Sequence, residues 1–316
     1  MRKFILKIIC LLINIPLILT YLIIININIK NANQDNYYFA IIDKTQRLQD
    51  TYNSDKRIIF FGGSNLALGL DSEKIQNEFN IPVVNMGLHA GYGFFHAIND
   101  SIPYIHQNDI IILCPEYSQI SKSGNGNYST WAIELVVNKK NIWDLHKRNF
   151  YDFPSEFFYF IKYLIKIGLN PLYFNDAVYR RSGFNKYGDS ILHLEGEFNI
   201  PEEMFTINAN VPLNLKYYKY FENAVNEFKK KHAVVIFNYP ICHEATFNAN
   251  IDSITEIDDY LRQHLDVLFA GTKEEYVCQR DMLFDTPYHA NKQGREWRTN
   301  LVIKHLHECY FDRQEK

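Results

Sequence analysis

The chain has 316 residues, of which 47% are hydrophobic, and its formal net charge is −3. This length is sufficient for one large core, or for one domain that carries an insertion. The sequence contains no long basic run that could neutralise phosphates, and this argues against a nucleic-acid partner. None of the five cysteines lies in a CxxC spacing, so we expect neither a zinc site nor another cofactor. Cys242 and Cys278 are the pair to test for a disulfide, although buried free thiols are the favoured state.

The N-terminus has the pattern of a membrane anchor. An apolar run over 4–25 follows Arg2 and Lys3, and Lys7 lies within its first turn. A helix of about 20 apolar residues crosses a bilayer, and the basic residues hold the short N-terminal side in the cytoplasm. The run exceeds the apolar region of a cleaved signal peptide, which has about 7–15 residues. We therefore predict an uncleaved signal anchor in 1–30, with cleavage as the alternative, and a catalytic domain outside the cytoplasmic membrane, in the periplasm or at the cell surface.

Residues 31–55 are polar and rich in Asn, with a short helical pattern at 38–48, and we predict a stalk. An α/β domain follows over 56–316. Short continuous apolar runs that end at Gly, Pro or polar residues predict buried strands, and helical patterns alternate with them. The strands are expected at 57–61, 82–85, 109–114, 233–237 and 267–269, and the helices at 72–79 (with Asp71 as N-cap), 94–106, 216–231, 254–265 and 291–307.

This alternation predicts a parallel sheet covered on both faces, a flavodoxin-like three-layer α/β/α fold. The alternation lapses at about 117–214, which we interpret as an aromatic-rich insertion. One helix is predicted there, at 154–167. It either packs on the domain with its apolar face or contacts a membrane surface.

Ligands of parallel sheets bind beyond the carboxyl ends of the strands, so the loops after the strands are where chemistry is expected. The first strand ends in Gly62-Gly63-Ser64-Asn65, where a tight turn would expose the Ser64 hydroxyl and amide at a helix N-terminus. A serine at this place is also an ordinary helix cap. After the second strand, Gly87 either turns its amide toward the same pocket or belongs to a simple glycine-rich turn.

A carboxylate and an imidazole lie close together before the last helix. Asp285 precedes His289 by four residues, in the segment Asp285-Thr286-Pro287-Tyr288-His289. A histidine base needs a partner that selects its tautomer, and Asp285 is suited to that role. The alternative interpretation is an Asp turn followed by an ordinary His.

With these pieces in the order Ser, Gly, Asp and His, the sequence resembles the SGNH (GDSL-like) hydrolase superfamily over about 57–118 and 233–307. More narrowly it resembles a membrane-anchored bacterial branch that is often associated with envelope polysaccharides. The resemblance implies a serine esterase or acyltransferase that needs no metal or cofactor. Ser64 would be the nucleophile, His289 the base and Asp285 its partner, while the amides of Ser64 and Gly87 would hold the oxyanion. We expect substrate contacts from Asn65, Glu116, Tyr117 and Tyr288.

The chain departs from the family pattern at two places. The third strand ends in Cys114-Pro115-Glu116-Tyr117-Ser118 and lacks the Asn that the family uses as an oxyanion donor. Tyr117, Ser118, a backbone amide or Asn185 of the insertion are the candidate replacements. The acid and the histidine are four residues apart rather than three, so either the turn bulges or a Ser–His pair works without the acid.

Two functions are therefore open. The first is acyl-ester chemistry on an acylated glycan, with O-acetyl groups of cell-envelope polysaccharide as the expected substrate. Hydrolysis and transfer use the same residues and are not distinguished. The second is an inactive relative that binds polysaccharide or acts as an assembly subunit.

Overall fold

The computed structural model of the protein describes residues 14–15, 18–19, 35–120, 176–196 and 215–314. The chain forms two compact units, one from 1–39 with 127–181 and one from 40–126 with 182–316. The predicted helix at 154–167 and most of the predicted anchor at 4–25 lie outside the described residues. Within the described part of the chain, no helix is long and apolar enough to cross a membrane.

The described part of the first unit is small. The 3₁₀ helix η1 (Tyr37–Phe39) follows Asn36, which forms an antiparallel bridge with Arg180. The rings of Tyr37 and Tyr179 pack edge to face, with their centroids 5.5 Å apart. These contacts tie the end of the unit's first segment to the end of its second segment.

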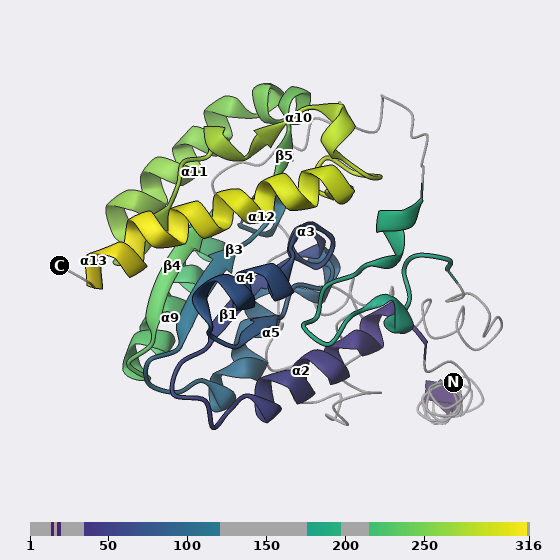
Figure 1. The fold of residues 1–316 in the computed structure, drawn as a ribbon, viewed down its shortest axis with the longest axis horizontal. Helices are drawn as coiled ribbons and strands as arrows, with labels where there is room; N and C mark the ends of the chain where they lie inside the picture. Colours follow the sequence, from purple (N-terminus) through teal and green to yellow (C-terminus); the bar gives the residue numbers. More distant parts are fainter. Residues whose placement is uncertain (1–13, 16–17, 20–34, 121–175, 197–214, 315–316) are drawn as a thin grey trace, which may run out of the picture. The chain divides into compact units, whose positions relative to one another are not determined.

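The second unit is built on a five-stranded parallel sheet, as the alternation of strand and helix patterns predicts (Figure 1). The strand order is β2-β1-β3-β4-β6, so the chain winds outward from β1 in one direction and from β3 in the other. The crevice beyond β1 and β3 is thus a topological switch point, where doubly wound sheets bind ligands. The bounds are β1 (Ile58–Gly62), β2 (Val83–Asn85), β3 (Ile110–Cys114), β4 (Val234–Asn238) and β6 (Leu268–Ala270).

Helices cover both faces of this sheet (Figure 1). Helices α5 (Phe94–Ser101) and α9 (Leu215–Lys230) contact each other, β1 and β4, whereas α12 (Lys292–Leu306) contacts α3 (Ser64–Gly69), α4 (Ser72–Phe79) and β6. Asp71 caps α4 as predicted, because its side chain accepts a hydrogen bond from the Lys74 amide. The other helices described for this unit are α10 (Glu244–Ala249), α11 (Ile251–His264), α13 (Asp312–Gln314), η2 (Ala90–Tyr92), η3 (Ile102–Tyr104), η7 (Leu192–Glu195), η9 (Glu274–Tyr276), η10 (Arg280–Met282) and the π-helix η11 (His307–Phe311). The 3₁₀ helix η6 (Arg181–Gly183) begins at the last residue of the first unit.

The predicted stalk is corrected over its helical part. Residues 40–50 form helix α2 (Ala40–Asp50), which packs along β2 at the edge of the sheet. The Lys44 ammonium is buried there and donates to the Asn85 carbonyl at 2.9 Å and the Gly188 carbonyl at 2.5 Å. The apolar face of α2 supplies Leu48 to the core. The polar composition that suggested a stalk therefore belongs to the exposed face of an amphipathic helix.

A second, two-stranded sheet pairs β5 (Cys242–His243) with β7 (Val277–Cys278) in parallel. Although Cys242 and Cys278 lie on these neighbouring strands, both are buried free thiols, as are Cys114 and Cys309. This agrees with the favoured prediction for the cysteines and not with the disulfide.

Candidate active site

The turn after β1 packs Ser64 closely against the end of β3. Gly62 has no room for a side chain, because a Cβ atom there would collide with the Cys114 carbonyl oxygen. A Cβ atom on Gly63 would lie 2.6 Å from Oε1 of Glu116. Ser64 then begins helix α3. The two glycines therefore allow the close approach that places the serine at the switch point of the sheet.

Glu116 is the hydrogen-bond partner of the Ser64 hydroxyl. The hydroxyl donates to Oε1 of Glu116 at 3.0 Å, and the Asn65 amide donates to the same oxygen at 3.1 Å. Ser64 is only 5% exposed and Glu116 6%. The sequence interpretation placed Glu116 in contact with substrate, but in this structure the carboxylate holds the serine.

Asn65 binds the protein rather than facing solvent. Its Nδ2 donates to the Cys114 carbonyl at 3.2 Å, and its Oδ1 accepts from the Gly63 amide at 3.0 Å. The buried Arg298 guanidinium donates to the Asn65 carbonyl and, at 3.2 Å, to Sγ of Cys114. Burial raises the pKa of the Cys114 thiol, and the charge of Arg298 opposes that rise. Asn65, which we predicted as a substrate contact, therefore fastens the serine turn to β3.

Asp285 reaches His289 in spite of the four-residue spacing. Oδ1 of Asp285 lies 2.6 Å from Nδ1 of His289. The turn closes because the Phe284 amide donates to the His289 carbonyl at 2.8 Å and Leu283 forms a bridge with Ala290. The carboxylate selects the neutral tautomer with hydrogen on Nδ1, so Nε2 is the nitrogen that can accept a proton. Of the two alternatives that the spacing left open, the structure has the bulged turn.

His89 connects the serine turn with the histidine turn electrostatically. Crowding by protein atoms lowers the pKa of His89; the charge of Glu116 opposes this shift and that of His289 adds to it. Both groups therefore lie close enough to His89 to act on it. Its Nδ1 accepts from the Gly91 amide at 2.9 Å, so the neutral ring carries its hydrogen on Nε2. The charges of Glu116 and His289 thus act on the same imidazole.

Tyr117 and Tyr288 lie in an apolar cluster beside this edge. The cluster contains Cys242, Phe247 and Ile254, with Tyr117 buried among them and Tyr288 packed against them. Burial raises the pKa of both phenols, and the charge of Glu116 contributes to the shift of Tyr288. These predicted substrate contacts accordingly form a mostly apolar wall next to Glu116.

Gly87 lies at the serine turn, but its amide is engaged. A Cβ atom on Gly87 would lie 2.8 Å from the Gly63 carbonyl oxygen, which places the two glycines side by side. The Gly87 amide donates to Oδ1 of Asn85 at 2.9 Å. The predicted role in an oxyanion hole therefore requires that this hydrogen bond be exchanged for one to the substrate.

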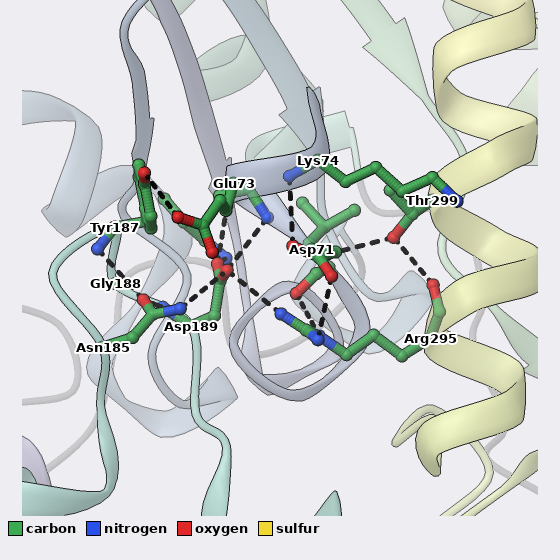
Figure 2. A network of polar contacts seen from close by, with 12 residues as sticks. Asp71, Glu73, Lys74, Asn185, Tyr187, Gly188, Asp189, Arg295 and Thr299 are labelled. Carbon is green, nitrogen blue, oxygen red and sulfur yellow. Dashed lines mark hydrogen bonds and ion pairs between the residues drawn. The ribbon is translucent and has the colours of Figure 1, made fainter. Parts of the chain in front are cut away.

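Asn185 belongs to a buried network around Asp189, which Figure 2 shows from close by. Oδ1 of Asn185 accepts from the amides of Tyr187 and Asp189, each at 3.0 Å, and Nδ2 lies 3.3 Å from Oδ2 of Asp189. Among the described residues, none of these bonds leads to Ser64. Asn185, a candidate for the missing oxyanion donor, therefore shapes its own loop.

Asp189 orients the block that contains Gly87, a role that the sequence interpretation missed. Its carboxylate accepts from the Ser72 amide at 2.9 Å and from Nδ2 of Asn85 at 2.9 Å, and it lies 3.4 Å from Arg295 (Figure 2). Asn85 also donates to the Leu66 carbonyl of α3 at 3.0 Å. The insertion thus supports the serine helix through a chain of hydrogen bonds.

Gln119 is a second residue that was missed. Its Oε1 accepts from the Glu116 amide at 3.0 Å and would lie 2.9 Å from a Cβ atom on Gly63. Its Nε2 is buried and has no hydrogen-bond partner within the described part of the chain. A polar residue in the first turn after a strand end was the available signal. Gln119 therefore offers a side-chain amide at the serine turn.

His193 connects the serine helix with the histidine turn. Its Nε2 lies 3.1 Å from the Leu68 carbonyl of α3 and 3.1 Å from the Ala290 carbonyl, which follows His289. Because both partners are acceptors, Nε2 carries the hydrogen. Burial lowers the pKa of His193 to about 4. The neutral ring is thus the form that joins the two halves of the site.

Among the residues that the structure describes, no group of three or more His, Cys, Asp or Glu side chains could hold a metal ion. Comparison of the chain with protein-family models and with curated proteins gives no match.

Proposed function

We propose that the protein is a serine esterase or acyltransferase of the SGNH type that acts on ester-linked acyl groups. The observation that carries this proposal is the 2.6 Å contact between His289 and Asp285, in the turn that His193 joins to the serine helix α3. A buried imidazole with one nitrogen held by a carboxylate is the arrangement that acyl transfer from a serine requires. The switch-point position of Ser64 supports the same conclusion.

The proposed chemistry proceeds through an acyl-enzyme. Ser64 attacks the ester carbonyl to form the acyl-enzyme, and the His289–Asp285 pair moves the proton of the acceptor to the serine when the acyl-enzyme is resolved. The oxyanion accepts a hydrogen bond from the Ser64 amide. It accepts a second one from the Gly87 amide, once that amide has given up its hydrogen bond to Asn85. The buried amide of Gln119, rather than Asn185, supplies the side-chain donor. Water as acceptor gives hydrolysis, and a sugar hydroxyl gives transfer.

The substrate class follows from the predicted location. An anchor over 4–25 would hold the catalytic unit outside the cytoplasmic membrane, beside the polysaccharides of the cell envelope. O-acetyl groups are the common small esters of such polymers, and the apolar wall of Tyr117 and Tyr288 suits a short acyl chain. We therefore propose O-acetylated envelope polysaccharide as the substrate.

The test uses the purified full chain with p-nitrophenyl acetate, an O-acetylated polysaccharide and a fluorophosphonate probe. We expect release of p-nitrophenol and acetate, and probe attached to Ser64 in the mass spectrum. Ser64→Ala should lose both signals, whereas Ser54→Ala, in the turn before β1 at the amino end of the sheet, should keep them. Activity that survives Ser64→Ala would exclude Ser64 as the nucleophile.

One observation favours a second function. At rest the Ser64 hydroxyl is bound by Glu116 and the Gly87 amide by Asn85, as would suit a site that no longer reacts. The protein would then be a subunit that binds or assembles polysaccharide. A chain that neither cleaves the two esters nor takes up the probe, but binds the acetylated polymer in calorimetry, would support this function instead.

A further inference from the structure

The carboxylate of Glu116 is placed where a proton from Ser64 would go. Oε1 of Glu116 is 3.0 Å from the serine oxygen, which is the distance of a formed hydrogen bond. The geometry required of a general base is contact of this kind with the proton it removes. The Asn65 amide holds the same oxygen at 3.1 Å, so the acceptor atom is fixed relative to the serine turn. The backbone of Glu116 is held in turn by Gln119.

Charge balance also favours proton transfer to Glu116. If His289 took the serine proton, Glu116 would remain negative beside an oxyanion that forms on the substrate, and the balancing positive charge would lie on the imidazolium. Two neighbouring anions in a buried site repel each other strongly. If Glu116 takes the proton, one negative charge moves from the carboxylate to the oxyanion and the charge of this part of the site is unchanged. Among the described residues, no Lys or Arg lies within ion-pair distance of Glu116 to offset a second anion.

On the basis of the proposed function, we propose that Glu116 is the base of the acylation step and that the His289–Asp285 pair is the base of the deacylation step. In a triad, one histidine carries the proton in both steps. Here two groups would each carry the proton in one step. Glu116 is then a catalytic residue of the reaction.

The acylation step balances with the groups present. The O–H bond of Ser64 breaks, its oxygen bonds to the ester carbon, and the carbonyl electron pair moves onto the carbonyl oxygen. The proton goes to Oε1 of Glu116. The carbonyl then re-forms, the bond to the leaving alcohol breaks, and Glu116 returns its proton to that alcohol oxygen. Glu116 ends as a carboxylate, ready for another cycle.

Deacylation balances with His289. Its Nε2 takes the proton of water or of an acceptor hydroxyl, whose oxygen attacks the acyl-enzyme carbonyl. When the bond to Ser64 breaks, the imidazolium gives the proton to the serine oxygen. Asp285 stabilises the imidazolium through Nδ1, at 2.6 Å.

The test separates the two steps with p-nitrophenyl acetate, because p-nitrophenolate leaves without needing a proton. Stopped-flow absorbance measures the acylation burst and the steady rate that follows it. Glu116→Gln keeps the shape of the side chain and an oxygen that can accept from Ser64 and Asn65, but it is not basic. His289→Gln removes the second base. Circular dichroism and thermal melting check that both variants fold.

We expect Glu116→Gln to slow the burst and the fluorophosphonate labelling of Ser64 by about 10²–10⁴-fold, the usual contribution of a general base. His289→Gln should keep a stoichiometric burst within about tenfold of the wild-type rate and then stall as acetyl-enzyme, visible as a mass increase on Ser64. Glu116→Asp, which keeps the carboxylate at a shorter reach, should give an intermediate burst rate and serves as the second variant if Glu116→Gln does not fold.

A burst in Glu116→Gln at nearly the wild-type rate would overturn this assignment, and so would a His289→Gln variant that loses its burst as completely as Glu116→Gln. Both outcomes leave the proposed function intact, because the wild-type chain still turns over through Ser64. A wild-type chain with no burst and no labelling is a different result, in which the proposed function itself fails and the role of Glu116 fails with it.

Discussion

The two ends of the central strands use the same kinds of buried polar side chains in opposite ways. At the amino end, Arg57 and Asp109 form a two-pronged ion pair at 2.9 and 2.6 Å, both completely buried. Arg57 also donates to the carbonyls of Leu48 and Tyr104, each at 2.8 Å. At the carboxyl end, the buried carboxylate of Glu116 accepts, within the described part of the chain, from a serine hydroxyl and a backbone amide.

The difference shows what each end is built to do. At the amino end, the Arg57 guanidinium is paired with the Asp109 carboxylate, and its other N–H groups donate to backbone carbonyls. Loss of either partner would therefore leave an unpaired charge in the interior. At the carboxyl end, neutral donors hold a carboxylate beside imidazoles, and proton transfer can redistribute charge there without breaking an ion pair. We therefore expect substitutions at the amino end to change folding stability and substitutions at the carboxyl end to change reaction rates.

The largest effect is expected from Asp285→Asn. The substitution keeps the size of the side chain, but the amide can donate to Nδ1 of His289 and thereby favours the wrong tautomer. In a serine triad the equivalent change costs about 10⁴-fold in kcat. Steady-state kinetics with p-nitrophenyl acetate should show a loss of this order. Asp281→Asn, an exposed carboxylate of the same region, is the matched control and should leave kcat unchanged.

Asp285 is 23% exposed on its side chain, so its substitution should change the unfolding free energy little. A fall in activity with an unchanged melting temperature would agree with the expected difference between the two ends of the central strands. A variant that loses stability and keeps kcat would instead show that the His289–Asp285 pair is part of the structural framework.

At the amino end, Asp109→Asn should destabilise the fold. The substitution leaves the Arg57 charge buried without a counter-charge, and breaking such a pair costs about 3–5 kcal/mol. Chemical denaturation should show this loss in the midpoint. The control is Glu227→Gln, which removes the carboxylate of an exposed pair with Lys230 and should change stability by less than about 1 kcal/mol. Equal effects of the two substitutions would contradict the difference between the two ends.

The elements of the sheet unit were largely predictable because their signals are local. Each predicted strand of the central sheet appears within one or two residues of its expected position, since a continuous apolar run ended by Gly or a polar residue depends on near neighbours alone. The cap at Asp71 was predictable for the same reason. The stalk was assigned wrongly because helix α2 is amphipathic and its polar face dominates the local composition. The contact of its apolar face with β2 is distant in sequence.

The candidate site was predictable only in part. Ser64 and the Asp285–His289 pair follow a strand or precede a helix, and their order along the chain was informative. The hydrogen-bond partner of Ser64 was not, because Glu116 is 52 residues away and its side chain direction depends on the packing of β1 against β3. The roles of Asp189 and His193 depend on contacts across more than 90 residues, which no local pattern contains.

Gln119 gives the next test at the carboxyl end. Gln119→Met keeps the volume of the side chain and removes the buried amide that we propose as an oxyanion donor. Loss of one such donor costs about 10²–10³-fold in kcat. The exposed Gln49→Met is the control for the same chemical change. A kcat within twofold of wild type would mean that the oxyanion receives its donors from backbone amides alone.

The smallest effect concerns His193 and acid. Its pKa is lowered from 6.5 to about 4, first by burial and then by the charges of His289 and Arg295, against the two carbonyl bonds that raise it. Between these pH values the unfolded chain binds a proton that the folded chain does not. Stability therefore falls as pH decreases from about 6.5 to 4, by about 3 kcal/mol at most for this group.

His193→Gln isolates that contribution, because its Nε2 can still donate to the carbonyls of Leu68 and Ala290 but does not titrate. Wild type and variant share all other titrating groups, so the difference between their unfolding free energies reports on His193. We expect wild type to lose more stability than the variant between pH 7 and pH 4 in urea titrations. Parallel curves of unfolding free energy against pH would show that the His193 ring takes up a proton in the folded state. The carboxyl end would then tolerate an unpaired buried charge, whereas the amino end holds its buried charge in an ion pair.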